Sequence, residues 1–277
     1  MKRLLAVASI ALAAGCASLI GIGDLTVEDG GADAVAPDSA APDSAAPDST
    51  APEGGGCGWP GPAAGLVGYW AYEEQSGKST ADCSDGGHPA TTYKAGWDDA
   101  GYLGGAMHIA LDSQSVVYGC FELSKSAPVP PSSFSLSAYI RLDTTVSGSA
   151  RWVAGRSNGP SIGWGVIVAP DGTSLSLKIF NALSDGGDYG PSIAGSWLDG
   201  AWHHVVATVP ADGGATIAID DASVTDPDPA PAIHVDTNDG VSLGCRGDGI
   251  YALIGVLDEV RIYDHVLDAG EIADLSK

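Results

Sequence analysis

Polar and apolar residues alternate strictly between Phe134 and Leu142. The apolar residues take every second position, and the residues between them include Tyr139 and Arg141. Successive side chains of a β-strand point to opposite faces, so this alternation predicts a strand with one core face and one non-core face. Tyr139 and Arg141 lie on the non-core face of the predicted strand.

Further apolar runs recur along the chain and predict further strands. They occupy residues 66–72, 106–111, 115–118, 152–156, 164–169, 175–180, 202–209, 216–220, 241–243 and 254–263. Asp-Gly pairs, which are typical of turns, fall between several of them, as at Asp171-Gly172 and Asp199-Gly200. Roughly a dozen strands without crossover helices predict an all-β fold, an antiparallel sandwich of two sheets.

One short helix is expected at the C-terminus. Asp268 is a suitable N-cap, and Glu271 follows three residues later, as in a capping box. With that start, Ile272 and Leu275 face the body of the domain.

The N-terminal segment has the pattern of a secretory signal. Lys2 and Arg3 precede an apolar run at residues 4–14, which is too short to span a bilayer. The run ends in Leu-Ala-Ala-Gly-Cys16, which resembles a bacterial lipobox and implies acylation of Cys16. An ordinary cleaved signal with an incidental cysteine is the alternative. Ala17-Ser18 lacks the Asp that commonly retains lipoproteins at an inner membrane, so we expect a lipid-anchored protein at the outer membrane or cell surface.

Residues 17–56 predict a disordered stalk. They contain three copies of an Ala-Pro-Asp-Ser motif at residues 36–50, with proline at every fifth position and no bulky apolar side chain in the repeat to bury. About 30 such residues, at about 3 Å each when extended, would hold a domain up to about 100 Å from the membrane. We therefore expect a signal peptide and lipobox at 1–16, a stalk at 17–56 and a folded domain at 57–277.

The net charge limits the possible partners, and the cysteines predict disulfides. The formal net charge is -23, from 35 acidic residues against 12 Lys and Arg, and such a surface repels phosphate backbones, so we expect no nucleic-acid partner. Apart from Cys16 there are four cysteines: Cys57, Cys83, Cys120 and Cys245. An even number in an oxidising compartment predicts two disulfides, with three possible connectivities. Free thiols and a zinc site are the alternatives, although no Cys-x-x-Cys spacing favours zinc.

Four segments, in chain order, resemble the laminin-G-like jelly-roll family of the concanavalin A-like lectin/glucanase superfamily. They begin with Gly65-Leu-Val-Gly-Tyr-Trp70 and the Ser-Leu-Ser-Ala-Tyr139-Ile-Arg strand. They continue with Trp202-His-His-Val-Val and Gly255-Val-Leu-Asp-Glu-Val-Arg-Ile-Tyr263. The resemblance implies a concanavalin A-like jelly roll over residues 57–277, and it implies function only loosely, because this fold serves lectins, adhesion modules and glycosidases.

No catalytic site is expected. Glucanases of this superfamily carry an E-x-D-x-x-E type pattern on one strand, which is missing here. Asp258 and Glu259 are neighbours on a predicted strand and should point to opposite faces, as should His203 and His204, for which packing roles are expected. We therefore predict a non-catalytic binding or adhesion module that recognises a polysaccharide or glycan. A structural or protein-binding surface lipoprotein is the alternative, and a divergent glycosidase is a third.

The resemblance also implies a structural calcium ion where the first and last strands meet. Asp258 and Glu74 match the acidic positions of those strands, and Asp82 matches an acid of the following loop. A solvated or capping role for each carboxylate is the alternative.

A glycan would bind to an aromatic and polar patch on a non-core face. Tyr139 and Arg141 lie on such a face, and so do Lys178 and Phe180 if the leucines around them point inward. Packing is the alternative role for these aromatic residues. The tryptophans of the strands are expected in the core: Trp70, Trp152, Trp164 and Trp202.

Overall fold

The computed structural model describes the C-terminal part of the chain. The described residues are 57, 61–92, 96–111, 117–123, 133–144, 148–157, 162–181, 188–236 and 239–277. They fall within the compact unit Thr50–Lys277. The predicted signal peptide, Cys16 and the stalk lie outside them.

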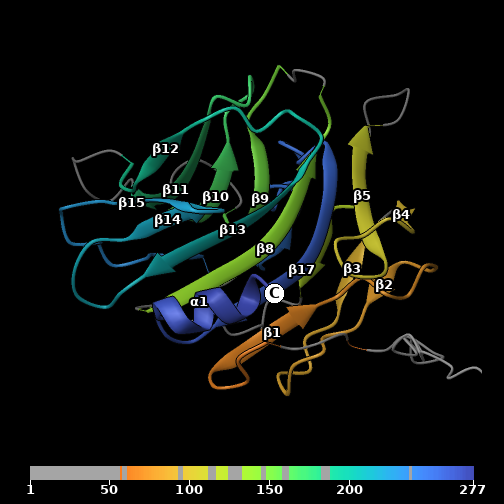
Figure 1. Cartoon of the computed structure of the whole chain (residues 1–277), viewed down its shortest axis with the longest axis horizontal. Helices are drawn as coiled ribbons and strands as arrows, with labels where there is room; N and C mark the ends of the chain where they lie inside the picture. The colour runs from red at the N-terminus through yellow and green to blue at the C-terminus, as the bar shows by residue number, and fades with distance from the viewer. Residues whose placement is uncertain are drawn as a thin grey trace, which may run out of the picture. The chain divides into compact units, whose positions relative to one another are not determined.

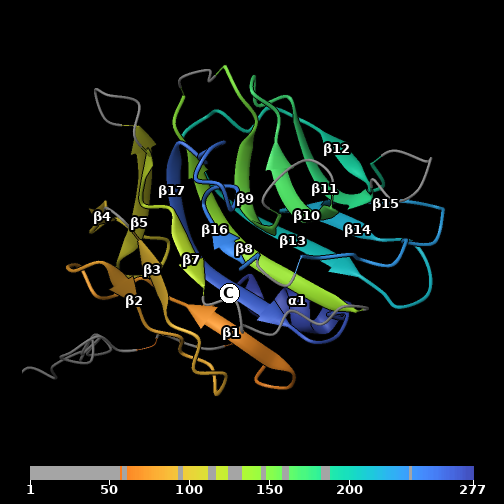
Figure 2. The same ribbon diagram turned by 180° about the vertical axis from the view of Figure 1, so that it is seen from behind.

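Two antiparallel sheets make up the domain (Figures 1 and 2). Sheet A has nine strands: β1 (Leu66–Trp70), β4 (Trp97–Asp98), β5 (Ala106–Leu111), β6 (Val117–Tyr118), β8 (Phe134–Leu142), β13 (Trp202–Val209), β14 (Thr216–Ile219), β15 (Ala222–Thr225) and β17 (Gly255–Tyr263). Sheet B has eight: β2 (Ser79–Thr80), β3 (Ala90–Thr92), β7 (Phe121–Leu123), β9 (Arg151–Arg156), β10 (Ile162–Val168), β11 (Ser174–Asn181), β12 (Ser192–Ala194) and β16 (Ser242–Leu243). The predicted all-β sandwich is confirmed.

Sequence-distant strands lie side by side at the centre of sheet A. The order runs β15-β14-β13-β8-β17-β5-β4, with β1 also paired to β17. β8 and β13 pair without interruption from Trp202↔Arg141 to Val209↔Phe134. The first and last strands of the domain therefore meet, as the resemblance implied.

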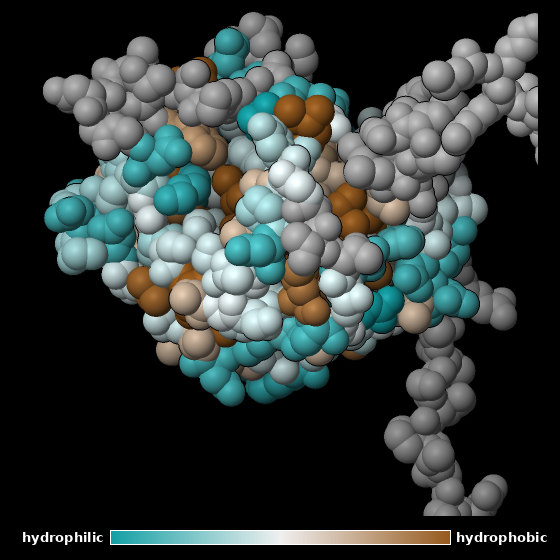
Figure 3. Space-filling view, turned by 90° about the horizontal axis from the view of Figure 1, so that it is seen from above, coloured by the Kyte–Doolittle hydropathy of each residue, from teal (hydrophilic) through white to brown (hydrophobic). Residues whose placement is uncertain are grey.

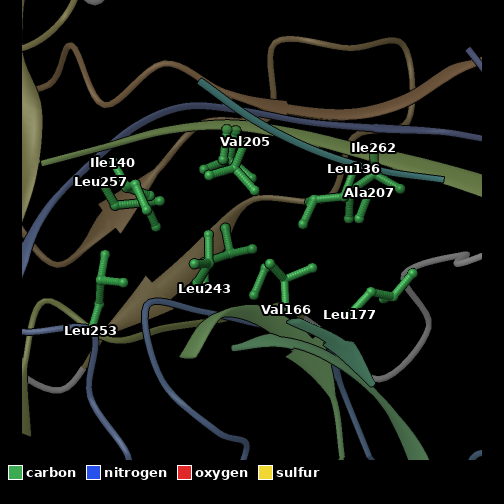
Figure 4. Packing of buried hydrophobic residues seen from close by; sticks show 14 of the residues in the cluster. Leu136, Ile140, Val166, Leu177, Val205, Ala207, Leu243, Leu253, Leu257 and Ile262 are labelled. Carbon is green, nitrogen blue, oxygen red and sulfur yellow. The ribbon is translucent and has the colours of Figure 1, made fainter. Parts of the chain in front are cut away.

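The core lies between the two sheets. Figure 4 shows side chains from sheet A, such as Leu136, Ile140 and Leu257, facing Val166 and Leu177 of sheet B. All five are fully buried. Burial of a side chain of this size stabilises the fold by roughly 1.5–3 kcal/mol, so the alternation that predicted these strands is also what holds the sheets together.

The helix α1 (Ala269–Leu275) forms where it was predicted. Asp268 caps it and forms a reciprocal capping box with Glu271. Leu275 and Ile272 pack against Tyr263 of β17 in a small cluster on the outer face of sheet A. This cluster is separate from the main core between the sheets.

Two disulfides join the four cysteines of the domain. Cys57 pairs with Cys83, and Cys120 pairs with Cys245, with Cα atoms 5.4 Å and 5.5 Å apart. Both separations are typical of disulfides. The structure thus selects one of the three connectivities that the sequence left open.

Large apolar side chains are rarely exposed on the described surface. The most exposed are Leu103, Val224, Ile250 and Val266, which come from four separate segments. On the face shown in Figure 3, hydrophobic residues form small islands among hydrophilic ones. Within the described residues, no helix has the length and apolar character needed to cross a bilayer.

Candidate functional site

On the outer face of sheet A, side chains of paired residues on neighbouring strands form rows across the sheet. Trp202 pairs with Arg141, Arg141 with Val256, and Val256 with His108, so these four residues form one row across β13, β8, β17 and β5. The next row toward the helix contains His204, Tyr139 and Asp258, paired in the same way.

The helix covers the second row from one side. The Tyr139 hydroxyl donates to the backbone carbonyl of Leu275 at 2.9 Å, and His204 Nδ1 lies 3.1 Å from the Ser276 hydroxyl. Tyr139 is only 4% exposed. Figure 1 shows α1 lying across this side of the sheet.

A loop covers the same row from the other side. The segment from Asp98 to Gly105, here called the 98–105 loop, places the Tyr102 ring on the Tyr139 ring, with centroids 3.6 Å apart and the planes nearly parallel. His204 stacks on Tyr139 at 4.6 Å. Because rings and helix enclose Tyr139, it cannot serve as an aromatic platform for a ligand, and that prediction is wrong.

The first row remains partly open and forms the candidate site. Arg141, Asp143, Thr144 and Gly200 line an open pocket of about 300 Å³ beside it. The pocket lies where β8 ends and where the chain enters β13. Its volume is at the lower limit for small-molecule sites, which suits one or two sugar rings.

Arg141 is held firmly at the edge of the pocket. Its guanidinium lies over the Trp202 ring, 4.9 Å from the centroid, and pairs with Asp98 at 3.3 Å. It also donates to the carbonyl of Ala100 at 3.3 Å. A planar guanidinium fixed in this way can present its remaining N–H groups to ligand oxygens at low entropic cost.

The carboxylate of Asp143 adds an acceptor to the pocket. Asp143 is partly exposed on the pocket wall, and its Oδ2 lies 3.9 Å from His108 Nε2. Carboxylate acceptors and guanidinium donors together match the paired donor and acceptor character of sugar hydroxyls. The site can therefore bind a polyhydroxylated ligand.

Lys178 and Phe180 lie on the opposite side of the molecule. They belong to β11 of sheet B, whose Leu177 and Ile179 point into the core. Phe180 faces outward, is 6% exposed and stacks on Trp152. The predicted four-residue patch is therefore wrong, because the two sheets turn their non-core faces in opposite directions.

The tryptophans divide between core and outer faces. Trp70 and Trp164 belong to the main core, as predicted. Trp152 instead lies flat on the outer face of sheet B over Gly155 and Gly165, which have no side chain there. Trp202 faces outward in sheet A. The alternation of side chains along a strand separates its two faces, but it does not show which face packs against the other sheet.

A β-bulge changes the orientation predicted for Asp258 and Glu259. The register of β17 against β8 shifts between Asp258 and Arg261, and Glu259 takes a φ of 53°. One extra residue places both carboxylates on the outer face, where Glu259 accepts from the Tyr69 hydroxyl at 3.0 Å and pairs with Arg261. The expected opposite orientation is wrong, yet both side chains are fully buried and out of reach of a polysaccharide.

These carboxylates have unusual acidities for the same reason. Desolvation by burial, together with the charge of Glu259, raises the pKa of Asp258 to about 8. Burial also raises the pKa of Glu259, against the opposing effect of Arg261. Perturbed carboxyls often mark active sites, but here their burial indicates a structural role.

The histidine pair divides between the faces as predicted. His204 points outward, where its Nε2 is 2.8 Å from the Ser137 hydroxyl. His203 lies at the edge of the sandwich between Asp220 and Asp199, at 2.8 Å and 3.0 Å. Burial lowers the pKa of His203, but these two carboxylates outweigh it and raise the pKa overall.

The three predicted calcium ligands do not form one oxygen cage. Asp82 accepts hydrogen bonds from the backbone N–H groups of Tyr69, Ser84 and His88, and Asp258 accepts three backbone N–H bonds of its own. Glu74 accepts from Ala81, and only its Oε2 is buried without a partner. Within the described residues, no three His, Cys, Asp or Glu side chains gather as a metal site. The residues therefore do not fit the calcium ion implied by the resemblance.

Several site residues were missed by sequence reasoning. Asp143 follows Arg141 by two positions and could have been placed on the same face by strand parity. Trp202, Asp98 and Gly200 reach the site through strand pairing and loop packing. Those relationships depend on tertiary structure and leave no local pattern.

Solved structures with the same fold include carbohydrate-binding domains. Domain 4 of AbnA, a GH43 extracellular arabinanase from Geobacillus stearothermophilus solved with arabinotriose, is 16% identical with a TM-score of 0.59; the match covers 77% of this chain and 99% of that one. The binding domain of botulinum neurotoxin DC, solved with SialylT, is 10% identical with a TM-score of 0.59, covering 77% of this chain and 51% of that one. The botulinum neurotoxin serotype G binding domain is 14% identical with a TM-score of 0.55, covering 76% and 50%. The chain thus spans about half the length of the toxin domains, and at these identities the likeness shows the fold.

Sequence comparison identifies the family to which the chain belongs. No curated protein sequence matches the chain. The family model for the concanavalin A-like lectin/glucanases superfamily matches residues 117–273, more than half of the chain and most of both sheets. The chain belongs to this superfamily.

Proposed function

We propose that the protein is a non-catalytic glycan-binding module of a cell-envelope lipoprotein, and that it binds its ligand at the Arg141 pocket. The observation that carries the proposal is the open end of the outer face of sheet A. There, the guanidinium of Arg141, which rests over the Trp202 ring, and the partly exposed carboxylate of Asp143 line a pocket of about 300 Å³. The arabinanase domain bound to arabinotriose is a relative in fold that supports the same ligand class.

A neutral glycan fits the electrostatics best. The chain carries a net charge of -23, which disfavours uronic acids and phosphorylated sugars. Arg141 already has Asp98 as its counterion, and Asp143 adds a second carboxylate to the pocket. The site therefore offers hydrogen bonds without a net positive charge.

A glycan array probed with the purified full chain in detergent tests this proposal. We expect binding to one class of neutral oligosaccharide, and Arg141→Ala should weaken it about tenfold or more, since hydrogen bonds from charged groups are each worth about 1.5–3 kcal/mol. Lys178→Ala is the matched control, because it removes a positive charge from the other sheet, and it should leave the affinity unchanged. A chain that binds no glycan, or an Arg141→Ala variant that binds as well as the wild type, would contradict the proposal.

The lipid anchor is part of the same proposal. The lipobox-like sequence ending at Cys16 and the proline-rich stalk support display of the module at the outer membrane or cell surface. Metabolic labelling with a fatty acid should mark the wild-type protein, and Cys16→Ala should abolish the label. Labelling that survives this substitution would contradict acylation at Cys16.

A further inference from the structure

The buried carboxyl group of Asp258 holds the loop that contacts Arg141 beside the pocket. Asp258 Oδ2 accepts the backbone N–H groups of Tyr102 and Leu103, at 2.8 Å and 3.1 Å. Its Oδ1 accepts the N–H of Glu259 at 2.7 Å. Asp258 belongs to the central strand β17, so these bonds tie the 98–105 loop to the most constrained part of sheet A.

The loop in turn fixes the guanidinium of the site. The carbonyl of Ala100 and the carboxylate of Asp98 both accept from Arg141. Tyr102 also contacts the edge of Trp202, with ring centroids 6.2 Å apart. Any displacement of the loop therefore removes two acceptors and one aromatic neighbour from the Arg141–Trp202 pair.

We propose that Asp258 is a positioning residue for the ligand site, acting through the backbone of the 98–105 loop. The proposal rests on the proposed function for the identity of the site. The resemblance implied that this aspartate binds a metal ion. The geometry instead gives it direct hydrogen bonds to the loop.

Both oxygens of the Asp258 carboxyl group accept here, Oδ2 from two N–H groups and Oδ1 from the third. An asparagine at position 258 has one acceptor oxygen and one NH₂ donor, so in either orientation at least one backbone N–H faces another donor. A buried donor left without an acceptor is costly, and a shift of Tyr102 and Leu103 away from position 258 would relieve that cost. The substitution Asp258→Asn should therefore release the loop while conserving side-chain volume.

Hydrogen exchange and glycan binding together test the role of Asp258. In the full chain in detergent, Asp258→Asn should speed exchange of the Tyr102 and Leu103 amides about tenfold or more and weaken glycan binding by a similar factor. Glu259→Gln is the matched control, because it alters the adjacent buried carboxylate, whose hydrogen bonds go to Tyr69 and Arg261, outside the loop. It should change neither amide exchange in the loop nor affinity, even if it lowers the melting temperature.

A second pair of variants approaches the same contact from the loop. Leu103 is 40% exposed, so Leu103→Pro removes its N–H without disturbing the core, while Leu103→Ala keeps the N–H. Proline should reduce glycan affinity and alanine should not. This pair stays informative if Asp258→Asn does not fold.

The outcomes separate this proposal from the proposed function. Faster loop exchange with unchanged affinity would overturn the positioning role and leave the glycan site standing. Unchanged exchange in Asp258→Asn would overturn the tether itself. A wild-type chain that binds no glycan would overturn the proposed function, and with it the ligand role of Asp258, while exchange alone would still decide whether the loop is tethered.

Discussion

The His204 imidazole lies 2.8 Å from the Ser137 hydroxyl on the buried outer face of sheet A. Its other nitrogen is close to Ser276, so neutral hydroxyl groups contact both ring nitrogens. Burial and the positive charge of Arg261 lower the pKa of His204 to about 4. The folded state therefore favours the neutral form of the His204 ring.

This pKa shift predicts a loss of stability in acid. In the unfolded chain, His204 takes up a proton near pH 6.5, whereas in the folded chain it does so only near pH 4, so stability falls as the pH decreases through that window. We expect this residue to contribute a loss of up to about 3 kcal/mol in the free energy of unfolding between pH 7 and pH 4. Urea unfolding at several pH values measures it.

The substitution His204→Gln tests the assignment. Glutamine keeps hydrogen bonds to both hydroxyls but does not titrate, so the pH dependence should become shallower by that amount. His234→Gln, at an exposed position, should leave the slope as it is in the wild type. Equal slopes for wild type and His204→Gln would exclude His204 as the source.

Close packing on the outer face of sheet B predicts a second effect. A Cβ atom added at Gly165 would lie 2.4 Å from the Trp152 ring. The ring cannot bend away as a flexible chain could, so Gly165→Ala should destabilise the fold by about 1–3 kcal/mol. Gly148→Ala is the control, because its Cβ would meet nothing within 4 Å. Chemical denaturation compares the two, and equal stabilities would contradict this packing.

The fold was predictable where apolar residues alternate over many positions. β8 was predicted with its observed bounds because its apolar residues take every second position over nine residues, and β13 was predicted with its observed bounds from a largely apolar run. β2, β4 and β12 have only two or three residues, too few to show a period. They form because neighbouring strands offer free backbone groups.

The site was predictable only in part. The alternation along β8 placed Arg141 on the outer face of sheet A, as observed. It could not show that α1 and Tyr102 enclose Tyr139 on that same face. The bulge at Glu259 depends on a positive φ that a glutamate does not signal in sequence. Assignment of a strand to sheet A or sheet B likewise depends on topology, so Lys178 and Arg141 could not be separated beforehand.

The two disulfides should differ in their contribution to stability. Cys120–Cys245 links residues 125 apart, whereas Cys57–Cys83 links residues 26 apart. In the chain-entropy treatment these bridges stabilise the fold by about 5 and about 3.5 kcal/mol. Paired alanine substitutions at each bridge, compared by urea unfolding, should therefore show the larger loss for Cys120/Cys245. A larger loss for Cys57/Cys83 would contradict a mainly entropic effect.

Removal of calcium should leave the melting temperature of the protein unchanged. A calcium ion needs six to eight oxygen ligands, and the carboxylates of Asp82 and Asp258 already accept backbone N–H groups, whose hydrogens occupy the directions that a cation would take. Thermal unfolding with added calcium and with EGTA provides the comparison. Asp258→Asn should lower the melting temperature equally in both buffers, because the lost contacts are hydrogen bonds. A melting temperature several degrees higher in calcium, with the metal found in the purified protein and the gain absent from Asp258→Asn, would instead show that this carboxylate binds the ion.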